Sequence, residues 1–213
     1  MKRPYIIINC AMSADGKIAS QSGKQLRISC EEDIKRMYKL RNESDAVLVG
    51  INTVLSDDPK LTVKEKYVKN PKQPIRIVLD TYCKTPIDSL IVSNVSKTLI
   101  ITGEKCNKKF GENVDIIICE KDNDSFINLK KLMVILKNKG INKLMVEGGG
   151  TVIWNFLKSG LVDDFYVYVG SIIIGGNDTP TLSGKVGDEN INLKLVKTKT
   201  IGSGILLRYR LIK

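Results

Sequence analysis

The chain has 213 residues, of which 42% are hydrophobic and 27% are charged, and its formal net charge is +11. These proportions are typical of a soluble globular protein, and the length is sufficient to bury a core without stabilising cross-links. No apolar run approaches the roughly 20 residues that a membrane span requires, and the first residues lack the pattern of a signal peptide. We therefore expect a cytoplasmic protein in which residues 1–213 form a single domain.

Two counts restrict the chemistry. The chain contains no histidine, which excludes a Ser-His-Asp triad and removes the commonest metal ligand and the usual general base near neutral pH. The five cysteines are dispersed and none lies in a Cys-x-x-Cys pair, a pattern that predicts reduced thiols rather than disulfides or a zinc site. Any reaction must therefore use carboxylates, Lys, Tyr, Cys or a bound cofactor.

The net charge of +11 is compatible with a nucleic-acid-binding protein. However, the lysines are spread along the whole chain, and the few aromatic residues, 6% of the total, do not cluster with them as a stacking platform would require. A distributed positive field also favours anionic small molecules. Nucleic-acid binding is the alternative from another functional class, and we expect neither a nucleic-acid partner nor a membrane partner.

Short apolar runs rich in β-branched residues alternate with helical patterns in the first three quarters of the chain. The predicted strands are residues 5–10, 46–50, 75–80, 97–102, 114–119 and 143–146. Ser29-Cys30-Glu31-Glu32 resembles a capping box that opens a helix ending near Asn42. Leu and Met repeat at helical spacing over residues 129–136, with Gly140 as the stop, and a third helix is predicted for residues 152–157.

The pattern changes after Asp164. Residues 165–174, 192–200 and 204–212 are predicted to be strands with no helix between them, and Gly202-Ser203-Gly204 is typical of a hairpin turn. The predicted fold class is therefore α/β, with a mixed, mostly parallel sheet, flanking helices and a C-terminal antiparallel hairpin.

Two segments about a hundred residues apart share one pattern. In each, an apolar strand ends at glycine and is followed by small hydroxylic residues and a short helix; the first runs from Val49 to Thr62 and the second from Leu144 to Asn155. This arrangement offers free backbone N–H groups and a positive helix end to an anion. We predict that the two segments form one site for a phosphorylated cofactor, the alternative for the triple glycine being a tight turn without a ligand.

Thr53 and Asp57 are four residues apart in the first segment, so they share one face of a helical turn. Their hydroxyl and carboxylate suit a nucleotide cofactor, and helix capping around Asp57-Asp58-Pro59 is the alternative. Arg41 lies seven residues after Ile34 on the apolar side of the first helix, which predicts a guanidinium aimed inward at a phosphate or carboxylate. A packed arginine that reaches the rim is the alternative there.

Two carboxylates are further candidates. Glu147 ends a predicted strand, at the edge of the sheet where α/β proteins bind ligands, although it could instead pair locally. Asp15 lies in an Asp-Gly turn after the first strand and could hydrogen-bond a sugar hydroxyl or a ring edge, the alternative being a simple turn.

Together these segments resemble the reductase of riboflavin biosynthesis, which occurs as the C-terminal half of a bacterial bifunctional deaminase–reductase and as a stand-alone enzyme in archaea and fungi. The residues that carry the resemblance follow in order along nearly the whole chain: Ser13 to Ala19, Arg27 to Ser29, Leu40-Arg41 with Asp45-Ala46, Val49-Gly50 to Pro59 with Leu61-Thr62, Ile77 to Asp80, Glu147 to Thr151, and Gly160 to Asp163. Bacterial members typically have Arg in place of Lys64 and Trp in place of Arg27, and the second difference favours the archaeal type.

The resemblance implies a dihydrofolate-reductase-like fold, a homodimer, and NADPH as the hydride donor, with NADH as an alternative donor. It also implies that the chain reduces 2,5-diamino-6-ribosylamino-4(3H)-pyrimidinone 5′-phosphate to the ribitylamino product, by hydride transfer to the former anomeric carbon. Because we expect a stand-alone reductase without a fused zinc deaminase, reduction would precede deamination. A reductase of the same fold that acts on the deaminated or a pterin-like substrate is one alternative, and a catalytically inactive relative is another.

The resemblance also implies roles for individual residues and no resident metal. The cofactor-binding residues would be Thr53, Asp57, Thr81, Tyr82, Cys83, Lys84, Gly148, Gly149, Gly150 and Thr151. The substrate-binding residues would be Asp15, Arg41, Leu61, Lys64 and Glu147. The proton that accompanies the hydride would come from Asp15, Glu147 or water.

Overall fold

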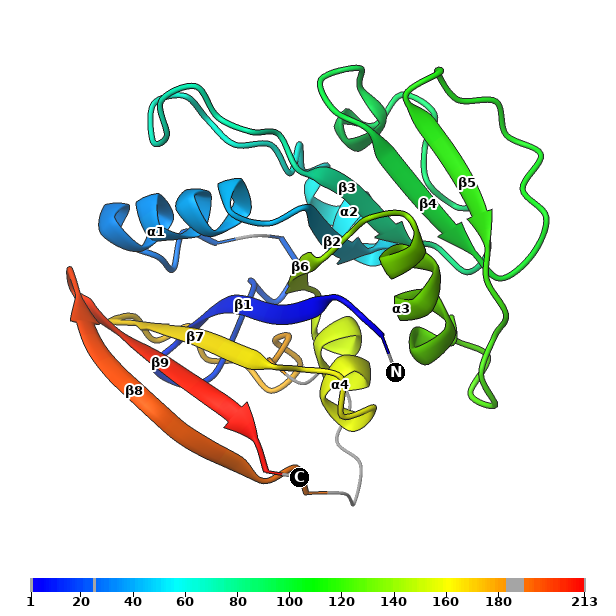
Figure 1. The fold of residues 1–213 in the computed structure, drawn as a ribbon. Coiled ribbons are helices and arrows are strands. Elements are labelled where there is room, and N and C mark those ends of the chain that lie inside the picture. Colours follow the sequence, from blue (N-terminus) through cyan, green and yellow to red (C-terminus); the bar gives the residue numbers. More distant parts are fainter. Residues whose placement is uncertain (1, 25, 183–189, 213) are drawn as a thin grey trace.

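Over the residues that the structure describes, nine strands form one sheet with helices on both of its faces (Figure 1). The structure is a computed structural model that describes residues 2–24, 26–182 and 190–212. The strands are β1 (Tyr5–Ser13), β2 (Ala46–Gly50), β3 (Ile75–Leu79), β4 (Thr98–Thr102), β5 (Val114–Ile118), β6 (Lys143–Gly148), β7 (Asp164–Gly170), β8 (Leu193–Ile201) and β9 (Gly204–Leu211). The helices are α1 (Glu31–Asn42), α2 (Ile51–Asp57), α3 (Leu129–Asn138) and α4 (Gly150–Lys158), with a short 3-10 helix η1 (Leu90–Val92).

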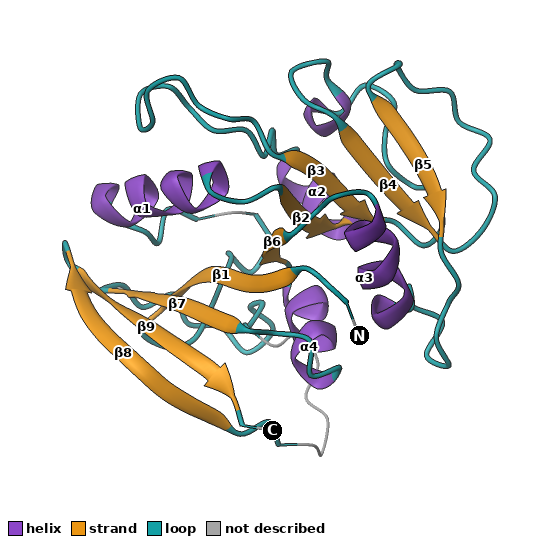
Figure 2. Ribbon diagram, in the orientation of Figure 1, coloured by secondary structure: helices purple, strands orange, loops and turns teal. Residues whose placement is uncertain are grey.

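The strand order is β5-β4-β3-β2-β6-β1-β7-β9-β8. Neighbouring strands from β5 to β7 are parallel, whereas β9 is antiparallel to both β7 and β8 (Figure 2). Ile201 pairs with Gly204, so Gly202 and Ser203 form a two-residue hairpin turn in which Gly202 has a positive φ of 53°. The predicted mixed, mostly parallel sheet with a C-terminal antiparallel hairpin is therefore confirmed.

The central feature of the topology is the place of β6. This strand lies between β1 and β2, although it follows them by about a hundred residues, and Leu144 pairs with Ile6 on one side and with Ala46 on the other. The carboxyl ends of β1, β2 and β6 are thus neighbours at one edge of the sheet. Open α/β sheets bind ligands at such crossover points.

The core has two parts, one on each face of the sheet. One contains Leu132 of α3 and Phe156 of α4, and the other contains Val54 of α2 and Ile91 of η1, with Leu40 of α1 packed against it. Because the central parallel strands are covered on both faces, their sequences are nearly continuous apolar runs rather than alternating ones.

Several element boundaries differ from those predicted. The first strand continues to Ser13 because it pairs with β7 as far as Gly170, and the strand predicted for residues 165–174 ends at Gly170 for the same reason. The helix predicted for residues 152–157 begins earlier, at Gly150, and ends at Lys158.

The predicted capping box is wrong. Helix α1 begins after Cys30, which makes no side-chain cap hydrogen bond, and the Ser29 hydroxyl instead donates to the Asp33 carboxylate at 2.6 Å. Asp33 is buried and also accepts a hydrogen bond from Arg36 at 2.7 Å. A buried carboxylate requires such donors, so the hydroxyl of Ser29 serves Asp33 rather than the end of the helix.

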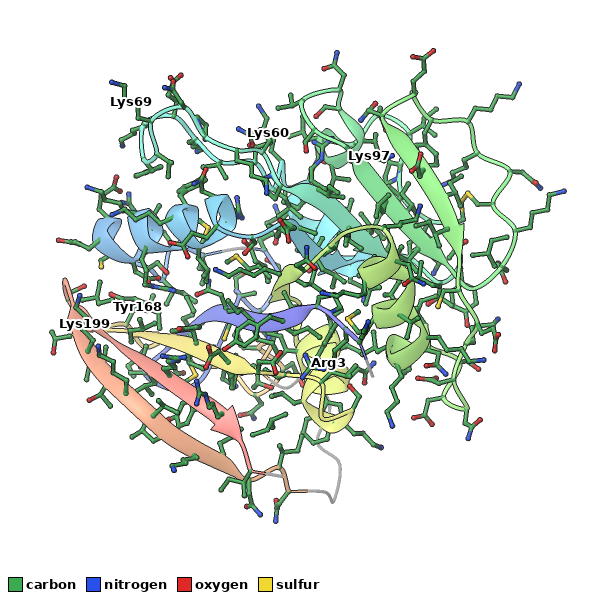
Figure 3. The ribbon with its side chains drawn as sticks, in the orientation of Figure 1. Arg3, Lys60, Lys69, Lys97, Tyr168 and Lys199 are labelled. Atoms are coloured by element: carbon green, nitrogen blue, oxygen red, sulfur yellow. A yellow bond between two sulfur atoms is a disulfide. The ribbon has the colours of Figure 1, made fainter. Side chains whose placement is uncertain are left out.

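The positive charge is distributed around the molecule. Lys60, Lys69, Lys97 and Lys199 lie well apart from one another on its outside (Figure 3). Within the described ranges, no helix has the length and apolar character needed to cross a membrane, and no three His, Cys, Asp or Glu side chains gather as a metal site would require.

A buried carboxylate at the start of β7 links three strands. Asp164 accepts hydrogen bonds from Arg208 of β9 at 2.8 and 2.9 Å and from the Tyr5 hydroxyl of β1 at 2.5 Å, with Arg210 at 3.3 Å. Burial by itself raises the pKa of Asp164, but the hydrogen bonds and charge of Arg208, with the bond from Tyr5, outweigh it and lower the pKa below the ordinary value. The ionised carboxylate therefore stabilises the folded state.

We predict that Asp164→Asn lowers the free energy of unfolding by about 2 kcal/mol at pH 7, because two partly exposed arginines lose their charged partner. Since the pKa of Asp164 is depressed in the folded state, its contribution is complete above the unfolded pKa of about 3.9 and is lost as the pH falls further. Urea unfolding between pH 7 and pH 2 measures this. The variant should lose less stability than the wild type below about pH 4, and parallel pH profiles would contradict the assignment.

Candidate functional site

A cleft of about 1420 Å³ opens at the carboxyl ends of the central parallel strands. Its walls come from β1, α1, the β2–α2 junction, the loop after β3, residues 59–64, residues 124–129 and the β6–α4 junction. Pockets for one small ligand usually measure about 300–1,000 Å³. The cleft is therefore large enough for two ligands held side by side.

The two glycine-containing segments meet in this cleft. The backbone N–H of Gly149 donates to the Thr53 hydroxyl at 3.1 Å. At Gly50, a Cβ atom would lie only 2.7 Å from the side chain of Val152, so glycine is required for the close approach of β2 and α4. The predicted meeting of the segments is confirmed, and their binding of a cofactor stays a prediction.

The N-terminus of α4 faces the cleft, since Gly149, Gly150 and Thr151 all line it. The helix has nine residues, its first turn holds no acidic residue, and its N-cap Gly149 makes no side-chain cap bond with any described residue. The first backbone hydrogen bond of the helix runs from the Ile153 amide to the Gly149 carbonyl at 3.1 Å. The Gly149 amide is taken by Thr53, so the amides between Gly149 and Ile153 and the positive end of the helix dipole are what suit a phosphate.

Gly148 plays a different part from the glycines that follow it. It is buried, does not line the cleft, and has a φ of +121° that side chains rarely adopt. Its peptide bond to Gly149 is cis. Gly148 thus turns the chain from β6 into α4.

Thr53 and Asp57 of α2 both line the cleft, as their shared helical face predicted. The residue that ends the helix is the next one, Asp58, which has a positive φ of 41° and accepts a hydrogen bond from the Leu90 amide at 2.7 Å. Helix capping, which we considered as an alternative for the segment Asp57-Asp58-Pro59, is therefore a role of Asp58.

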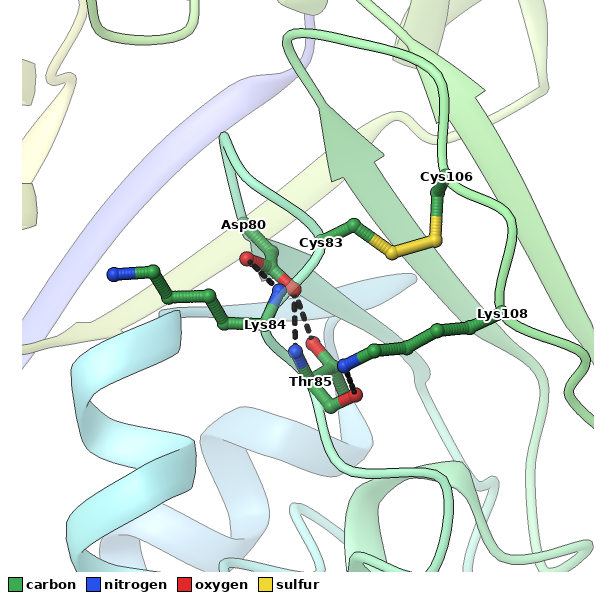
Figure 4. Close-up of a disulfide and its surroundings, with 6 residues drawn as sticks. All are labelled: Asp80, Cys83, Lys84, Thr85, Cys106 and Lys108. Atoms are coloured by element: carbon green, nitrogen blue, oxygen red, sulfur yellow. Dashed lines mark hydrogen bonds between the residues drawn. A yellow bond between two sulfur atoms is a disulfide. The ribbon is translucent and has the colours of Figure 1, made fainter.

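The loop after β3 is fixed by a buried carboxylate. Asp80 accepts hydrogen bonds from the Lys84 amide at 2.8 Å and from the amide and hydroxyl of Thr85, both at 2.7 Å (Figure 4). Among the four predicted cofactor residues of this loop, Thr81, Tyr82 and Lys84 line the cleft and Cys83 does not. Tyr82 is half exposed, and the ammonium of Lys84 lies 5.9 Å from the centre of its ring.

The prediction that all cysteines are reduced thiols is wrong for two of them. Cys83 and Cys106 form a disulfide, with Cα atoms 5.6 Å apart, whereas Cys10, Cys30 and Cys119 are free. The bonded pair lies on the loops after β3 and β4, and adjacent parallel strands place those loops side by side. A separation of 23 residues without a pair motif carries no local sign of this contact.

Arg41 points inward, as its position on α1 predicted, and its partner is Glu147. The two nitrogens Nε and Nη2 donate to the two carboxylate oxygens at 2.6 Å, and Nη1 donates to the Thr62 carbonyl at 3.0 Å. Both side chains are nearly buried, with 11% and 13% of their areas exposed. Burial acts to lower the pKa of Arg41, but the charge and hydrogen bonds of Glu147 together raise it. The guanidinium keeps further N–H groups beyond these three bonds.

The other predicted substrate residues beside this ion pair also line the cleft. Leu61 is buried and has a positive φ of 48°, and Lys64 is exposed with its ammonium 5.8 Å from the Tyr38 ring. The Arg41 guanidinium lies 5.3 Å from the same ring. This wall of the cleft is therefore positively charged and suited to an anion.

Asp15 is the exception among the predicted substrate residues, because it does not line the cleft. Its carboxylate accepts hydrogen bonds from the Ser13 hydroxyl at 2.5 Å and from the amides of Gly175 and Ile174 at 2.7 and 3.1 Å. These bonds, that of Ser13 first, lower the pKa of Asp15 to about 2. Asp15 holds two loops together here, and its contact with a substrate stays a prediction.

Asn9 and Asp33 are buried polar residues of the cleft that were not predicted from the sequence. Asn9 is a buried polar residue on β1 that accepts a hydrogen bond from Arg36 at 2.6 Å, and Asp33 holds the same arginine from α1. Asn9 directly follows three isoleucines, and this interruption of an apolar run was the available sign. Asp33 carries no such sign, because an acidic residue in the first turn of a helix is common for electrostatic reasons.

Comparison with known proteins places the chain among riboflavin-pathway proteins. A family model described as the RibD C-terminal domain matches residues 4–207. The chain is 40% identical to the 2,5-diamino-6-ribosylamino-4(3H)-pyrimidinone 5′-phosphate reductase of Archaeoglobus fulgidus and 36% identical to the protein of the same name from Methanothermobacter thermautotrophicus. The first alignment covers 98% of both chains, and the second covers 97% of this chain and 98% of the relative.

Solved structures agree with the family match. The riboflavin biosynthesis reductase Rib7 of Saccharomyces cerevisiae superposes with a TM-score of 0.82 at 26% identity, covering 99% of this chain and 90% of Rib7. A deaminase–reductase of Thermotoga maritima gives a TM-score of 0.85 at 24% identity, over 99% of this chain and 57% of that protein. These likenesses confirm the predicted dihydrofolate-reductase-like fold.

We predict strong coupling between Arg41 and Glu147 in a double-mutant cycle of unfolding free energies. Arg41→Met should cost about 3 kcal/mol, because it leaves a nearly buried carboxylate without its partner. The double variant, with both Arg41→Met and Glu147→Gln, should cost much less than the sum of the costs of the two single variants. The exposed pair Lys97–Asp115 is the matched control, and its coupling should stay below about 1 kcal/mol. Additive effects of Arg41→Met and Glu147→Gln in urea unfolding would show that the ion pair is not formed.

Proposed function

Because the chain belongs to the RibD C-terminal domain family, we propose that it is the NADPH-dependent reductase of riboflavin biosynthesis that acts on 2,5-diamino-6-ribosylamino-4(3H)-pyrimidinone 5′-phosphate. NADH is an alternative donor. The observation that carries the proposal is the single cleft in which a glycine-rich helix start and a buried Arg41–Glu147 pair lie on adjoining walls. One wall suits a nucleotide phosphate and the other suits a polar, anionic substrate.

The residues of the first wall fit a nicotinamide dinucleotide. The uncapped start of α4 offers backbone donors to a phosphate, and at Gly149 a Cβ atom would lie 3.4 Å from the Thr53 hydroxyl. Asp57, Tyr82 and Lys84 also line the cleft, and we assign them to this wall. We assign the cofactor to this wall, with its phosphates at Gly149 and the residues that follow.

The second wall is assigned to the substrate. Lys64 and the N–H groups of Arg41 that Glu147 leaves available would bind anionic and carbonyl groups of the substrate. Arg41 also orients the Glu147 carboxylate, whose oxygens can accept hydrogen bonds from the amino groups of a diaminopyrimidine. Lysine binds a phosphate as a point charge without the two-pronged geometry of arginine, so Lys64 would attract the 5′-phosphate without fixing its orientation.

The cofactor would supply a hydride to the former anomeric carbon once the ribosylamine has opened to an imine. The protein contributes alignment, which can be worth about 7–11 kcal/mol when two reactants are held in the correct geometry. Asp15 is a poor source of the accompanying proton, because hydrogen bonds lower its pKa to about 2 and it lies outside the lining of the cleft. Both oxygens of Glu147 accept hydrogen bonds from Arg41, so of the three candidates water is the one that we propose as the proton source.

A homodimer belongs to the same proposal. The last strand of the sheet, β8, leaves large apolar side chains on the surface, and Leu195 and Val196 are 50% and 41% exposed. Ile205 on the neighbouring β9 is 47% exposed. Large apolar side chains left exposed at the edge of a sheet are typically covered by another surface, and a second copy of the chain would cover these three.

The central test is a titration with NADPH, followed by nicotinamide fluorescence, on the wild type and on Gly149→Val. We expect the wild type to bind and the variant to bind at least about tenfold more weakly, equivalent to about 1.4 kcal/mol, because a branched side chain would occupy the space beside Thr53. Gly111→Val is the control, since Gly111 is exposed and does not line the cleft. Unchanged affinity in a folded Gly149→Val protein would remove the cofactor from this wall.

The same assay separates the candidate substrates. Consumption of NADPH should be fastest with the 2,5-diamino compound, and a preference for the deaminated or a pterin-like compound would replace the proposed substrate. Arg41→Met should retain NADPH binding but reduce kcat/KM by about 100-fold, in line with about 3 kcal/mol for a charged hydrogen bond. Equal kcat/KM values for the two proteins would leave Arg41 with a structural role alone.

Salt dependence separates the enzyme from a nucleic-acid-binding protein. A chain of charge +11 will bind any polyanion weakly at low salt, but such binding falls steeply as salt rises, because each phosphate contact releases counterions. We expect NADPH binding to persist at about 150 mM salt, since groups within a cleft are screened less, while DNA and RNA binding largely disappears. Tight RNA binding at that salt without NADPH binding would favour the other class.

A further inference from the structure

The loop that carries Tyr82 and Lys84 is joined by a disulfide to a second loop outside the cleft. Cys83 follows β3, and Cys106 lies in the segment of residues 103–113 that follows β4 (Figure 4). Neither cysteine lines the cleft, whereas both sequence neighbours of Cys83 do. The disulfide therefore lies outside the cleft, next to two residues that line it.

The loop has a rigid half and a less restrained half. Toward Thr85, the buried Asp80 carboxylate fixes the backbone through the amides of Lys84 and Thr85, and it also accepts a hydrogen bond from the Thr85 hydroxyl. At the turn itself, the Cys83 amide donates to the Asp80 carbonyl at 3.1 Å, and Cys83 has a positive φ of 53°. A residue other than glycine keeps such a backbone conformation only where its surroundings hold it.

The second loop touches the first at three places. The Gly103 amide donates to the Thr81 carbonyl at 3.0 Å, the Lys108 ammonium donates to the Thr85 carbonyl at 2.8 Å, and the disulfide lies between these two contacts. The two hydrogen bonds attach the ends of the cleft loop. The disulfide restrains the turn at Cys83, between Tyr82 and Lys84. It adds a covalent restraint to the bond of the Cys83 amide and to the Lys121 ammonium, which lies 5.5 Å from the centre of the Tyr82 ring.

The remaining cysteines are poor candidates for the same chemistry. Cys10 and Cys119 are buried, and burial raises the pKa of both thiols, which disfavours the reactive thiolate. Cys30 directly precedes α1, and its thiol donates to the Ile201 carbonyl at the end of β8 rather than to the cleft loop. Cys83 and Cys106 are only partly buried, so small thiols and disulfides can reach them.

We propose that Cys83 and Cys106 form a reversible thiol–disulfide pair that orders the loop of residues 81–84 and thereby raises the affinity of the cleft for its nucleotide cofactor. This inference rests on the proposed function for the identity of that cofactor. In the forward step, the two cysteine thiols and one small-molecule disulfide become the Cys83–Cys106 disulfide and two small-molecule thiols. The two electrons pass to the small disulfide, and the two thiol protons pass to the thiols that leave.

The expected change in affinity follows from the conformational freedom of the loop of residues 81–84 and not from a new contact with the cofactor. When the pair is reduced, the backbone at Tyr82 and Cys83 and the side chains of Tyr82 and Lys84 sample more conformations, and the cofactor must order them as it binds. When the pair is oxidised, this ordering is already complete. The oxidised chain should therefore bind NADPH at least about fivefold more tightly than the reduced chain, which is the lower end of common coupling between two sites.

The test compares the full-length protein after equilibration with glutathione disulfide and after reduction with dithiothreitol, each followed by removal of the reagent. Three quantities are measured: free thiols in the denatured protein, amide hydrogen exchange of the peptide spanning residues 81–85, and the Kd for NADPH. We expect three free thiols in the oxidised chain and five in the reduced chain, with slower exchange and tighter binding in the oxidised state. The exchange readout does not depend on a cofactor.

Cys83→Ser and Cys106→Ser should each behave like the reduced wild type under both treatments. Cys30→Ser is the matched control and should respond as the wild type does, since Cys30 is free and lies away from the loop. Five free thiols after oxidation would overturn the proposal, as would equal loop exchange and equal Kd values in the two states. If neither state bound NADPH while loop exchange still followed the thiol state, the cofactor assignment would fail and the control of the loop by the pair would be supported.

Discussion

The cleft depends on the close approach of two strands that are distant in the chain. Pairing of β6 with β2 places the glycine run beside Gly50, and the contact of 2.7 Å that a Cβ at Gly50 would make with Val152 shows how little space is left. The hydrogen bond from Gly149 to Thr53 completes the junction. Any side chain larger than hydrogen at Gly50 would force Val152 of α4 to move from its place beside β2.

The ion pair of Arg41 and Glu147 is the second constraint on the site. It joins α1 to the end of β6 within one wall of the cleft, and it consumes two of the donors that an inward arginine offers. A ligand on this wall therefore meets a nearly neutral, pre-oriented pair together with the free charge of Lys64, rather than an isolated guanidinium. Fixed donors and acceptors of this kind select a ligand by hydrogen-bond pattern as well as by charge.

Patterns in the sequence predicted the features that depend on neighbouring residues. The β-branched runs gave the strands, the glycine-to-helix pattern predicted that two distant segments would meet, and the position of Arg41 on its helix predicted that it points inward. The partner of Arg41 was beyond such patterns, because Glu147 is 106 residues away and no periodicity connects the two. The predictions for Ser29 and for the Cys83–Cys106 pair were wrong for the same reason. The contact of Ser29 depends on the burial of Asp33, and the disulfide depends on the adjacency of β3 and β4, and both exist only in the folded chain.

The insertion of β6 also bears on how the chain is made. Strand β1 pairs only with β6 and β7 among the described strands, so its apolar residues Ile6 to Ile8 have no sheet partner until residues 143–170 have left the ribosome. For most of synthesis, the nascent chain carries an unpaired strand with two open edges, the kind of segment that associates with other chains. Completion of this sheet is therefore a late event in synthesis, and the edges of β1 are covered only when β6 and β7 have emerged.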